Sequence, residues 1–127
     1  MGGGCELALL CDIVYCSEET RFALPELKLG LIPGIGGTQR YLIFNSRMAK
    51  IAGRINTMHY VLTSDFIYAP KAKDLGFVSE VFKKEELHDK VIGIANEITN
   101  KPLTAILAAK EAIKQTENLS MSEGIAL

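Results

Sequence analysis

The sequence has no strong excess of charge of either sign, few cysteines and no long hydrophobic run. Its 127 residues, about the length of one domain, carry 14 Lys and Arg against 15 Asp and Glu. A general nucleic-acid binder needs a basic face, so a net charge of −1 argues against that class. Apolar runs such as Leu7–Cys11 fall far short of the roughly 20 residues that span a bilayer. The composition, 48% apolar and 23% charged, is that of a globular domain.

Three cysteines, an odd number, argue against a disulfide framework. Cys5, Cys11 and Cys16 do not have zinc-site spacing, and the two histidines, His59 and His88, are remote from them in sequence. We therefore expect no metal site. We expect the three cysteines to be reduced, buried thiols.

Residues 1–83 mix helical and strand signals. β-Branched and aromatic runs predict short strands over 13–16, 21–24 and 77–82. Apolar periodicity and helix-boundary residues predict helices over 5–11, 37–42, 58–63 and 70–75. Between residues 29 and 37, glycine and proline are too dense for a helix interior, which predicts a loop.

Two apolar stripes at helical spacing follow. The first comprises Leu87, Val91, Ile94 and Ile98, and the second comprises Leu103, Ile106, Leu107 and Ile113. Both are interpreted as packing faces. The order of elements predicts an α/β class protein, with a catalytic-type core over 1–83 followed by a helical region over 84–127.

The first candidate site is the run Gly2-Gly3-Gly4-Cys5-Glu6 at the start of a predicted helix. A helix N-terminus has unpaired N–H groups and a partial positive charge, and glycine lets a ligand oxygen approach closely. The run therefore predicts an oxyanion site with the Glu6 carboxylate beside it. The alternative is a tight turn followed by a glutamate that only interacts with the helix dipole.

The second candidate is Glu26, which follows Leu24-Pro25 and precedes the glycine-rich loop. That loop has no Gly-Lys pair, as a Walker A loop would, and Gln39 stands where a dinucleotide-binding pattern needs glycine. Taken alone, Glu26 could be a solvated carboxylate. Together, two carboxylates can share one water, with one group accepting its proton and the other transferring a proton at carbon. This arrangement would suit addition of water across a carbonyl-conjugated double bond.

Five linked segments carry a resemblance to a known family. Residues 2–9, 24–26, 30–40, 61–63 and 72–78 closely resemble the enoyl-CoA hydratase/isomerase (crotonase) family. The similarity is closest to the short-chain enoyl-CoA hydratases of fatty acid β-oxidation, which are hydro-lyases. It extends over nearly the whole chain and implies the C-terminal half of such a subunit.

The resemblance implies a role for each candidate residue. Glu6 corresponds to the carboxylate that activates water, and Glu26 to the one that handles the proton at the α-carbon. Gly3 corresponds to one of the two N–H donors of the oxyanion hole. Further substrate contacts are implied at Gly2, Pro33 and Gly34. Coenzyme A would be part of the substrate, and neither a cofactor nor a metal is implied.

The family fold implies a crotonase-like spiral of ββα units, with this chain as its C-terminal part. A helical C-terminal region follows, which assembles trimers or dimers of trimers. The second oxyanion donor and neighbouring strands lie in the family's N-terminal half, so the chain alone is expected to be inactive and poorly folded. Between Lys50 and Val61 the chain is longer than the usual pattern. The implied location is the mitochondrial matrix, or the cytoplasm in a bacterium.

The presence of both glutamates favours a hydratase over the family's isomerases. Two alternatives stay open. One is a hydratase for a branched or dicarboxylic substrate of the methylglutaconyl-CoA type. The other is a non-catalytic crotonase-like chain, such as a structural subunit. A capping box at Ser120 to Glu123, with only four residues after it, and a glycine turn with nothing before it favour a chain that is part of a longer protein.

Overall fold

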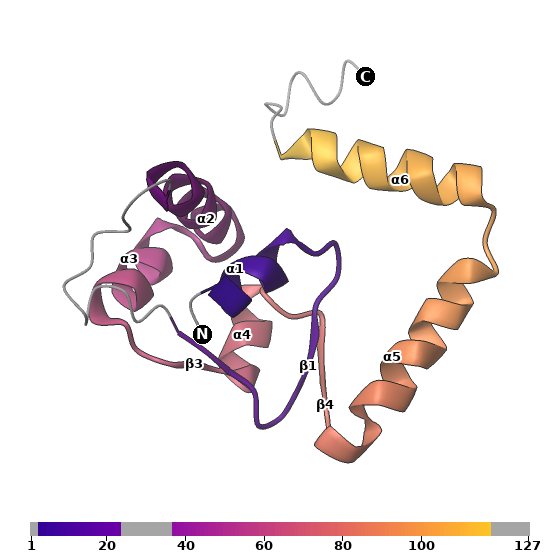
Figure 1. The fold of residues 1–127 in the computed structure, drawn as a ribbon, viewed down its shortest axis with the longest axis horizontal. Helices are drawn as coiled ribbons and strands as arrows, with labels where there is room; N and C mark the ends of the chain where they lie inside the picture. The colour runs from indigo at the N-terminus through magenta and orange to yellow at the C-terminus, as the bar shows by residue number, and fades with distance from the viewer. Residues whose placement is uncertain (1–2, 24–36, 118–127) are drawn as a thin grey trace. The chain divides into compact units, whose positions relative to one another are not determined.

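The computed structural model describes residues 3–23 and 37–117 (Figure 1). Contacts divide the chain into two units, Met1–His88 and Asp89–Leu127. The boundary falls within helix α5, Lys84–Thr99, so the division at residue 84 expected from the sequence stays a prediction. Within the described ranges, no helix has the length and apolar character needed to cross a membrane.

The helices of the first unit lie where the sequence predicted them. They are α1 (Gly3–Leu10), α2 (Gly37–Ala52), α3 (Arg54–Thr63) and α4 (Ala69–Leu75). Helix α2 is longer than predicted, and α3 begins earlier. Only Gly53, with a φ of 84°, separates the two helices. This positive φ is readily adopted by glycine, so the break between α2 and α3 falls at the one residue suited to it.

Four short strands form two separate pairs. Strand β1 (Tyr15–Ser17) pairs in parallel with β4 (Glu80–Phe82), with Tyr15 opposite Glu80. Strand β2 (Arg21–Phe22) pairs antiparallel with β3 (Ile67–Tyr68), with Phe22 opposite Ile67. The predicted strand over 13–16 begins later, at Tyr15, and the one over 77–82 begins at Glu80. Strand β3 was not predicted, because two residues are too few to show a period.

Helix α4 shows how local sequence sets an element's ends. Pro70 lies in its first turn, where the missing N–H costs nothing. Gly76 ends it with a φ of 92°, and the Phe77 N–H donates to the Ala72 carbonyl at 2.9 Å. Because Phe77 and Val78 are buried directly after this cap, they join the core instead of extending β4.

The core of the first unit gathers side chains from all four helices. Met48, Ala69 and Ala72 are at most 1% exposed. None of the three cysteines forms a disulfide, and Cys5 and Cys16 are buried as predicted. Cys11 is exposed, which corrects the prediction of three buried thiols. It lies just after the last residue of α1, where the chain has left the packed face of the helix.

The two predicted apolar stripes differ in burial. On α5 the four residues of the first stripe are half-buried, and every other residue of the helix is exposed. Helix α6 (Leu103–Thr116) carries the second stripe. There Ile106 is half-buried, whereas Leu103, Leu107 and Ile113 are each more than half exposed. The packing role interpreted for the second stripe is therefore not seen among the described residues.

Candidate active site

Helix α1 is held against the first unit by one face. Cys5, Ala8 and Leu9 follow the i, i+3, i+4 spacing of a single helix face and line an apolar pocket. Leu7 and Leu10, on other faces, are 66% and 58% exposed. The buried face fixes the rotation of α1 about its axis and hence the direction of Glu6.

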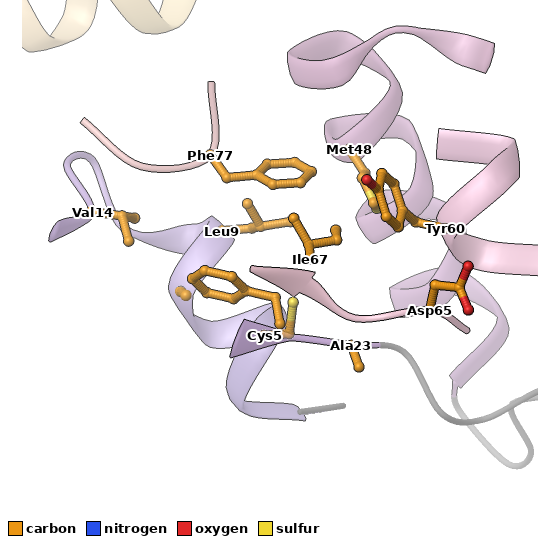
Figure 2. A pocket seen from close by; sticks show the side chains of 11 residues that line it. Cys5, Leu9, Val14, Ala23, Met48, Tyr60, Asp65, Ile67 and Phe77 are labelled. Atoms are coloured by element: carbon orange, nitrogen blue, oxygen red, sulfur yellow. The ribbon is translucent and has the colours of Figure 1, made fainter. Parts of the chain in front are cut away.

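The pocket lies against α1 and among α2, α3 and β3 (Figure 2). Its volume is about 390 Å³, including the space open to solvent. Apolar side chains such as Met48, Ile67 and Phe77 line it, and its surface is almost entirely apolar. Glu6 is not among the described lining residues. The pocket is thus a packing space that supports α1, with the predicted catalytic carboxylate outside it.

The carbonyl end of α1 has three hydrogen-bond donors. Arg47 Nη1, from α2, donates to the Leu9 carbonyl at 3.1 Å. The Cys11 N–H donates to the Ala8 carbonyl at 3.1 Å, and its thiol to the Leu7 carbonyl at 3.5 Å. Such donors satisfy carbonyls that have no partner within the helix. The positive charge of the guanidinium is also attracted to the negative end of the helix dipole.

The opposite end of α1 carries the predicted oxyanion donor and the first carboxylate. The helix begins at Gly3, and Glu6 lies in its first turn. A side chain built at Gly4 would meet nothing within 4 Å. Because Cα–Cβ bonds tilt toward the helix N-terminus, Glu6 is directed toward the end where the Gly3 N–H lies. The structure therefore brings these two predicted groups to one end of α1.

The Glu6 carboxylate is half-buried and has no fixed partner in the described part of the chain. No hydrogen bond or ion pair joins it to another residue within 3–23 or 37–117. A structural glutamate normally has such a partner or is fully solvated. In the described part of the chain Glu6 has no such partner and is not fully solvated, so it stays a candidate for the predicted role.

The other predicted site residues lie outside the described residues. They are Gly2, Glu26, Pro33 and Gly34. The meeting of Glu6 with Glu26 at one water is therefore still a prediction. So is the loop expected between residues 29 and 37.

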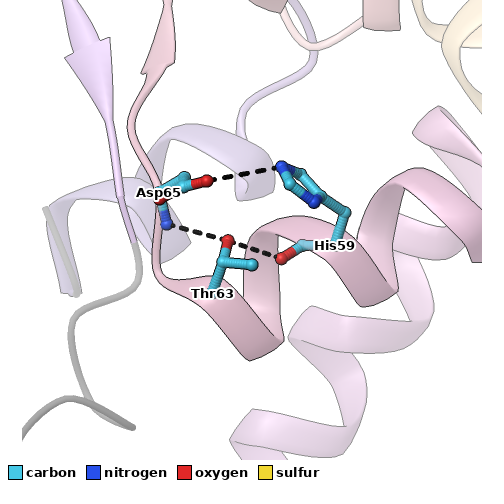
Figure 3. A network of polar contacts seen from close by, with 3 residues as sticks. All are labelled: His59, Thr63 and Asp65. Atoms are coloured by element: carbon cyan, nitrogen blue, oxygen red, sulfur yellow. Dashed lines mark hydrogen bonds and ion pairs between the residues drawn. The ribbon is translucent and has the colours of Figure 1, made fainter.

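A polar network at the end of α3 was missed from the sequence (Figure 3). His59 Nε2 lies 3.4 Å from Asp65 Oδ2, and both side chains are more than half exposed. The Thr63 hydroxyl donates to the His59 carbonyl at 2.6 Å and accepts from the Asp65 N–H at 3.2 Å. The Thr-x-Asp spacing is a signal for such a turn. Among the described residues, no group of three His, Cys, Asp or Glu is placed to hold a metal ion.

Burial also changes the acidity of one thiol near the core. The pKa of Cys16 is raised because its surroundings disfavour the thiolate, and a hydrogen bond with Thr20 opposes this in part. A raised pKa disfavours a nucleophilic role at neutral pH. Cys16 is therefore a structural residue.

Helices packed with two small sheets define an α/β protein, and the Glu6 carboxylate in the first turn of α1 is its candidate acid–base group. The sequence pattern of the enoyl-CoA hydratase/isomerase family matches residues 1–127. The chain belongs to this family.

Several curated relatives match almost the whole chain. A probable enoyl-CoA hydratase of Rhizobium meliloti is 37% identical over 98% of the chain and 46% of its own length. The mitochondrial enoyl-CoA hydratase of Pongo abelii is 39% identical over 99% of the chain and 41% of its own length. The 2,3-dehydroadipyl-CoA hydratase of Escherichia coli is 36% identical over 99% of the chain and 47% of its own length. The chain therefore spans less than half the length of these relatives.

Solved structures show the same fold. An enoyl-CoA hydratase subunit from Geobacillus kaustophilus superposes with a TM-score of 0.83 and 33% identity, over 98% of this chain and 46% of that one. The Bacillus anthracis enoyl-CoA hydratase gives 0.81 and 34%, with the same coverage. The chain thus has part of the α/β crotonase fold, as the resemblance implied.

Proposed function

We propose that this chain provides the water-activating carboxylate of an enoyl-CoA hydratase, a hydro-lyase of fatty acid β-oxidation. The reaction is syn addition of water to a trans-2-enoyl-CoA, which gives a 3-hydroxyacyl-CoA. The observation that carries the proposal is the half-buried Glu6 carboxylate, which has no partner in the described part of the chain and lies in the first turn of the helix that Gly3 begins.

In the proposed mechanism, Glu6 removes a proton from water while the water oxygen forms a bond to the β-carbon of the thioester. The electron pair of the double bond moves toward the carbonyl, whose oxygen gains negative charge. The Gly3 N–H donates a hydrogen bond to that oxygen, and Glu26 delivers a proton to the α-carbon. Each carboxyl group typically contributes 10²–10⁴-fold to such proton transfers. Preorganised donors at the oxyanion contribute a further electrostatic term.

The proposal extends to substrate binding, assembly and location. Gly2, Pro33 and Gly34 contact the substrate, and coenzyme A belongs to that substrate, so no separate cofactor or metal is needed. The whole protein is a trimer or a dimer of trimers. Mitochondrial relatives from Pongo abelii and Dictyostelium discoideum support a mitochondrial location, and the bacterial relatives support a cytoplasmic one.

A dicarboxylic substrate is a second candidate, because one relative is a 2,3-dehydroadipyl-CoA hydratase. A comparison of crotonyl-CoA with 2,3-dehydroadipyl-CoA as substrates separates the two. A higher kcat/KM for crotonyl-CoA supports the β-oxidation assignment. Hydration of neither thioester supports a non-catalytic crotonase-like chain.

The decisive test compares three purified proteins. The first is the 127-residue chain, and the second is the part of the Pongo abelii hydratase that this chain does not match. The third, the joined protein, carries both parts in one polypeptide. Loss of the conjugated thioester's absorbance reports hydration of crotonyl-CoA. We expect activity only in the joined protein, because a cleft needs both of its walls and both oxyanion donors. A folded joined protein without activity, with the fold shown by circular dichroism, would contradict the proposed function.

A further inference from the structure

We propose that Arg47 is a positioning residue for Glu6, acting through the backbone of α1. This inference rests on the proposed function. Arg47 itself touches no reacting atom in that mechanism. Its guanidinium instead holds the carbonyl end of the helix whose other end carries Glu6 and the Gly3 N–H.

The contact joins two helices that are remote in sequence. Arg47 lies on α2 and Leu9 on α1, 38 positions apart, and Nη1 donates to the Leu9 carbonyl at 3.1 Å. Arg47 is half-buried, and its neighbour Met48 is 1% exposed, which anchors this turn of α2 in the core. The Arg47 guanidinium therefore donates from a turn of helix that the core holds in place.

Helix α1 needs such an anchor because it is short. Eight residues make little more than two turns, and isolated helices of that length are not stable in water. Its packed face, Cys5 and Leu9, resists rotation about the helix axis. A hydrogen bond at the carbonyl end opposes both fraying and sliding along the axis. Sliding would move Glu6 and Gly3 together relative to a bound substrate.

The first experiment needs no catalytic activity and uses the joined protein described above. Cys5 is buried on α1, Cys16 is buried on β1, and Cys11 is exposed. The rate of alkylation at each thiol, resolved by fragment-ion mass spectrometry, reports local opening of α1 with β1 as the internal control. We expect Arg47→Met to speed alkylation of Cys5 about tenfold without changing Cys16. Arg47→Lys, which keeps a donor, should restore much of the protection.

The matched control is Arg54→Met, which makes the same chemical change at an exposed position on α3. It should leave all three alkylation rates unchanged. Equal protection of Cys5 in Arg47→Met and the parent would overturn the proposal, and so would a Cys5 in the parent that reacts as fast as Cys11. Faster alkylation of both Cys5 and Cys16 would also overturn it, because that reports general unfolding.

The second experiment measures kinetics in the joined protein described above. Displacement of a catalytic group by about 1 Å can cost on the order of 10²-fold in rate. We expect Arg47→Met to lower kcat by roughly 10- to 100-fold with little change in KM, and Arg47→Lys to recover most of it. An unchanged kcat would overturn the proposal. If the parent joined protein is inactive, the proposed function fails and the thiol rates alone decide the role of Arg47.

Discussion

His59 Nε2 lies 3.4 Å from Asp65 Oδ2, so the last turn of α3 is tied to the residue that leads into β3. Ser64, which lies between them in sequence, is 3% exposed and has the left-handed conformation, with a φ of 54°. Its hydroxyl is buried and has no hydrogen-bond partner among the described residues. The chain thus leaves α3 through a buried, strained residue, next to an exposed contact between His59 and Asp65.

The His59–Asp65 contact, which is an ion pair only when the imidazole is protonated, should contribute little to stability. Both side chains are more than half exposed, and exposed pairs contribute about 0.2–1 kcal/mol, less at high salt. We expect Asp65→Asn to lower the free energy of unfolding by less than about 1 kcal/mol. Urea denaturation at low and high salt measures this. A larger loss that persists at high salt would contradict this, because the substitution leaves the hydrogen bond from the Asp65 N–H to Thr63 intact.

Ser64→Gly should stabilise the chain. Glycine adopts a positive φ without steric cost and removes the unpartnered hydroxyl. Against this, glycine gains entropy in the unfolded chain, so we expect a net increase of about 0.5–1 kcal/mol in the free energy of unfolding. Ser64→Ala is the control, since it removes the hydroxyl but keeps the strain, and should gain less. A lower unfolding midpoint for Ser64→Gly than for the parent would refute this account.

The two carboxylates should each be essential in the joined protein. We expect Glu6→Gln and Glu26→Gln to reduce kcat for crotonyl-CoA hydration by about 10²–10⁴-fold, because an amide cannot accept or deliver the proton. Glu18→Gln makes the same change at an exposed turn and should leave kcat unchanged. Near-normal turnover in either of the first two variants would remove that residue from the mechanism.

The Gly3 N–H can be tested by proline substitution, because proline is tolerated in the first turn of a helix. Gly3→Pro deletes the N–H, whereas Gly3→Ala keeps it. Loss of one oxyanion donor costs about 3–4 kcal/mol of transition-state stabilisation. Turnover by the joined protein should therefore be abolished by Gly3→Pro and reduced less by Gly3→Ala. Equal activity in Gly3→Pro and the parent would exclude Gly3 as a donor.

The buried thiol of Cys16 predicts a loss of stability in alkali. Its pKa is raised in the folded chain by burial, so the folded state resists ionisation more than the unfolded state does. Cys16 therefore contributes stability that is fully present below the unfolded pKa of roughly 8.5 and is lost as the pH rises through the folded pKa. The unfolding free energy of Cys16→Ala, measured from pH 7 to 10, should fall less steeply than that of the parent. Parallel curves would contradict this.

Elements set by local sequence could be predicted, and those set by distant partners could not. Pro70 and Gly76 mark both ends of α4, and the stripe from Leu87 to Ile98 marks α5. Strand β3 was not predicted, because its two residues form a strand only through their pairing with β2. The exposure of Cys11 was not predicted either, because it depends on where α1 ends relative to the core.

The same distinction applies to the candidate site: features set by adjacent residues could be predicted, and contacts between distant residues could not. The place of Glu6 in the first turn of a glycine-led helix follows from adjacent residues, and the structure has it there. The Arg47 contact with Leu9 has no local signal, because it joins positions 38 residues apart. The approach of Glu26 to Glu6 depends on residues 24–36 and stays a prediction.

The parallel pairing of β1 with β4 sets an order of events during synthesis. Among the described residues, the strand partner of Tyr15 is Glu80, which is made much later. At about 5–20 residues per second, the edge of β1 that β4 covers stays unpaired for several seconds on the ribosome. Pairings between strands this far apart in sequence slow folding, because closing the intervening loop costs entropy before the strands make any contact. This edge of β1 is therefore open to association with another strand until β4 emerges.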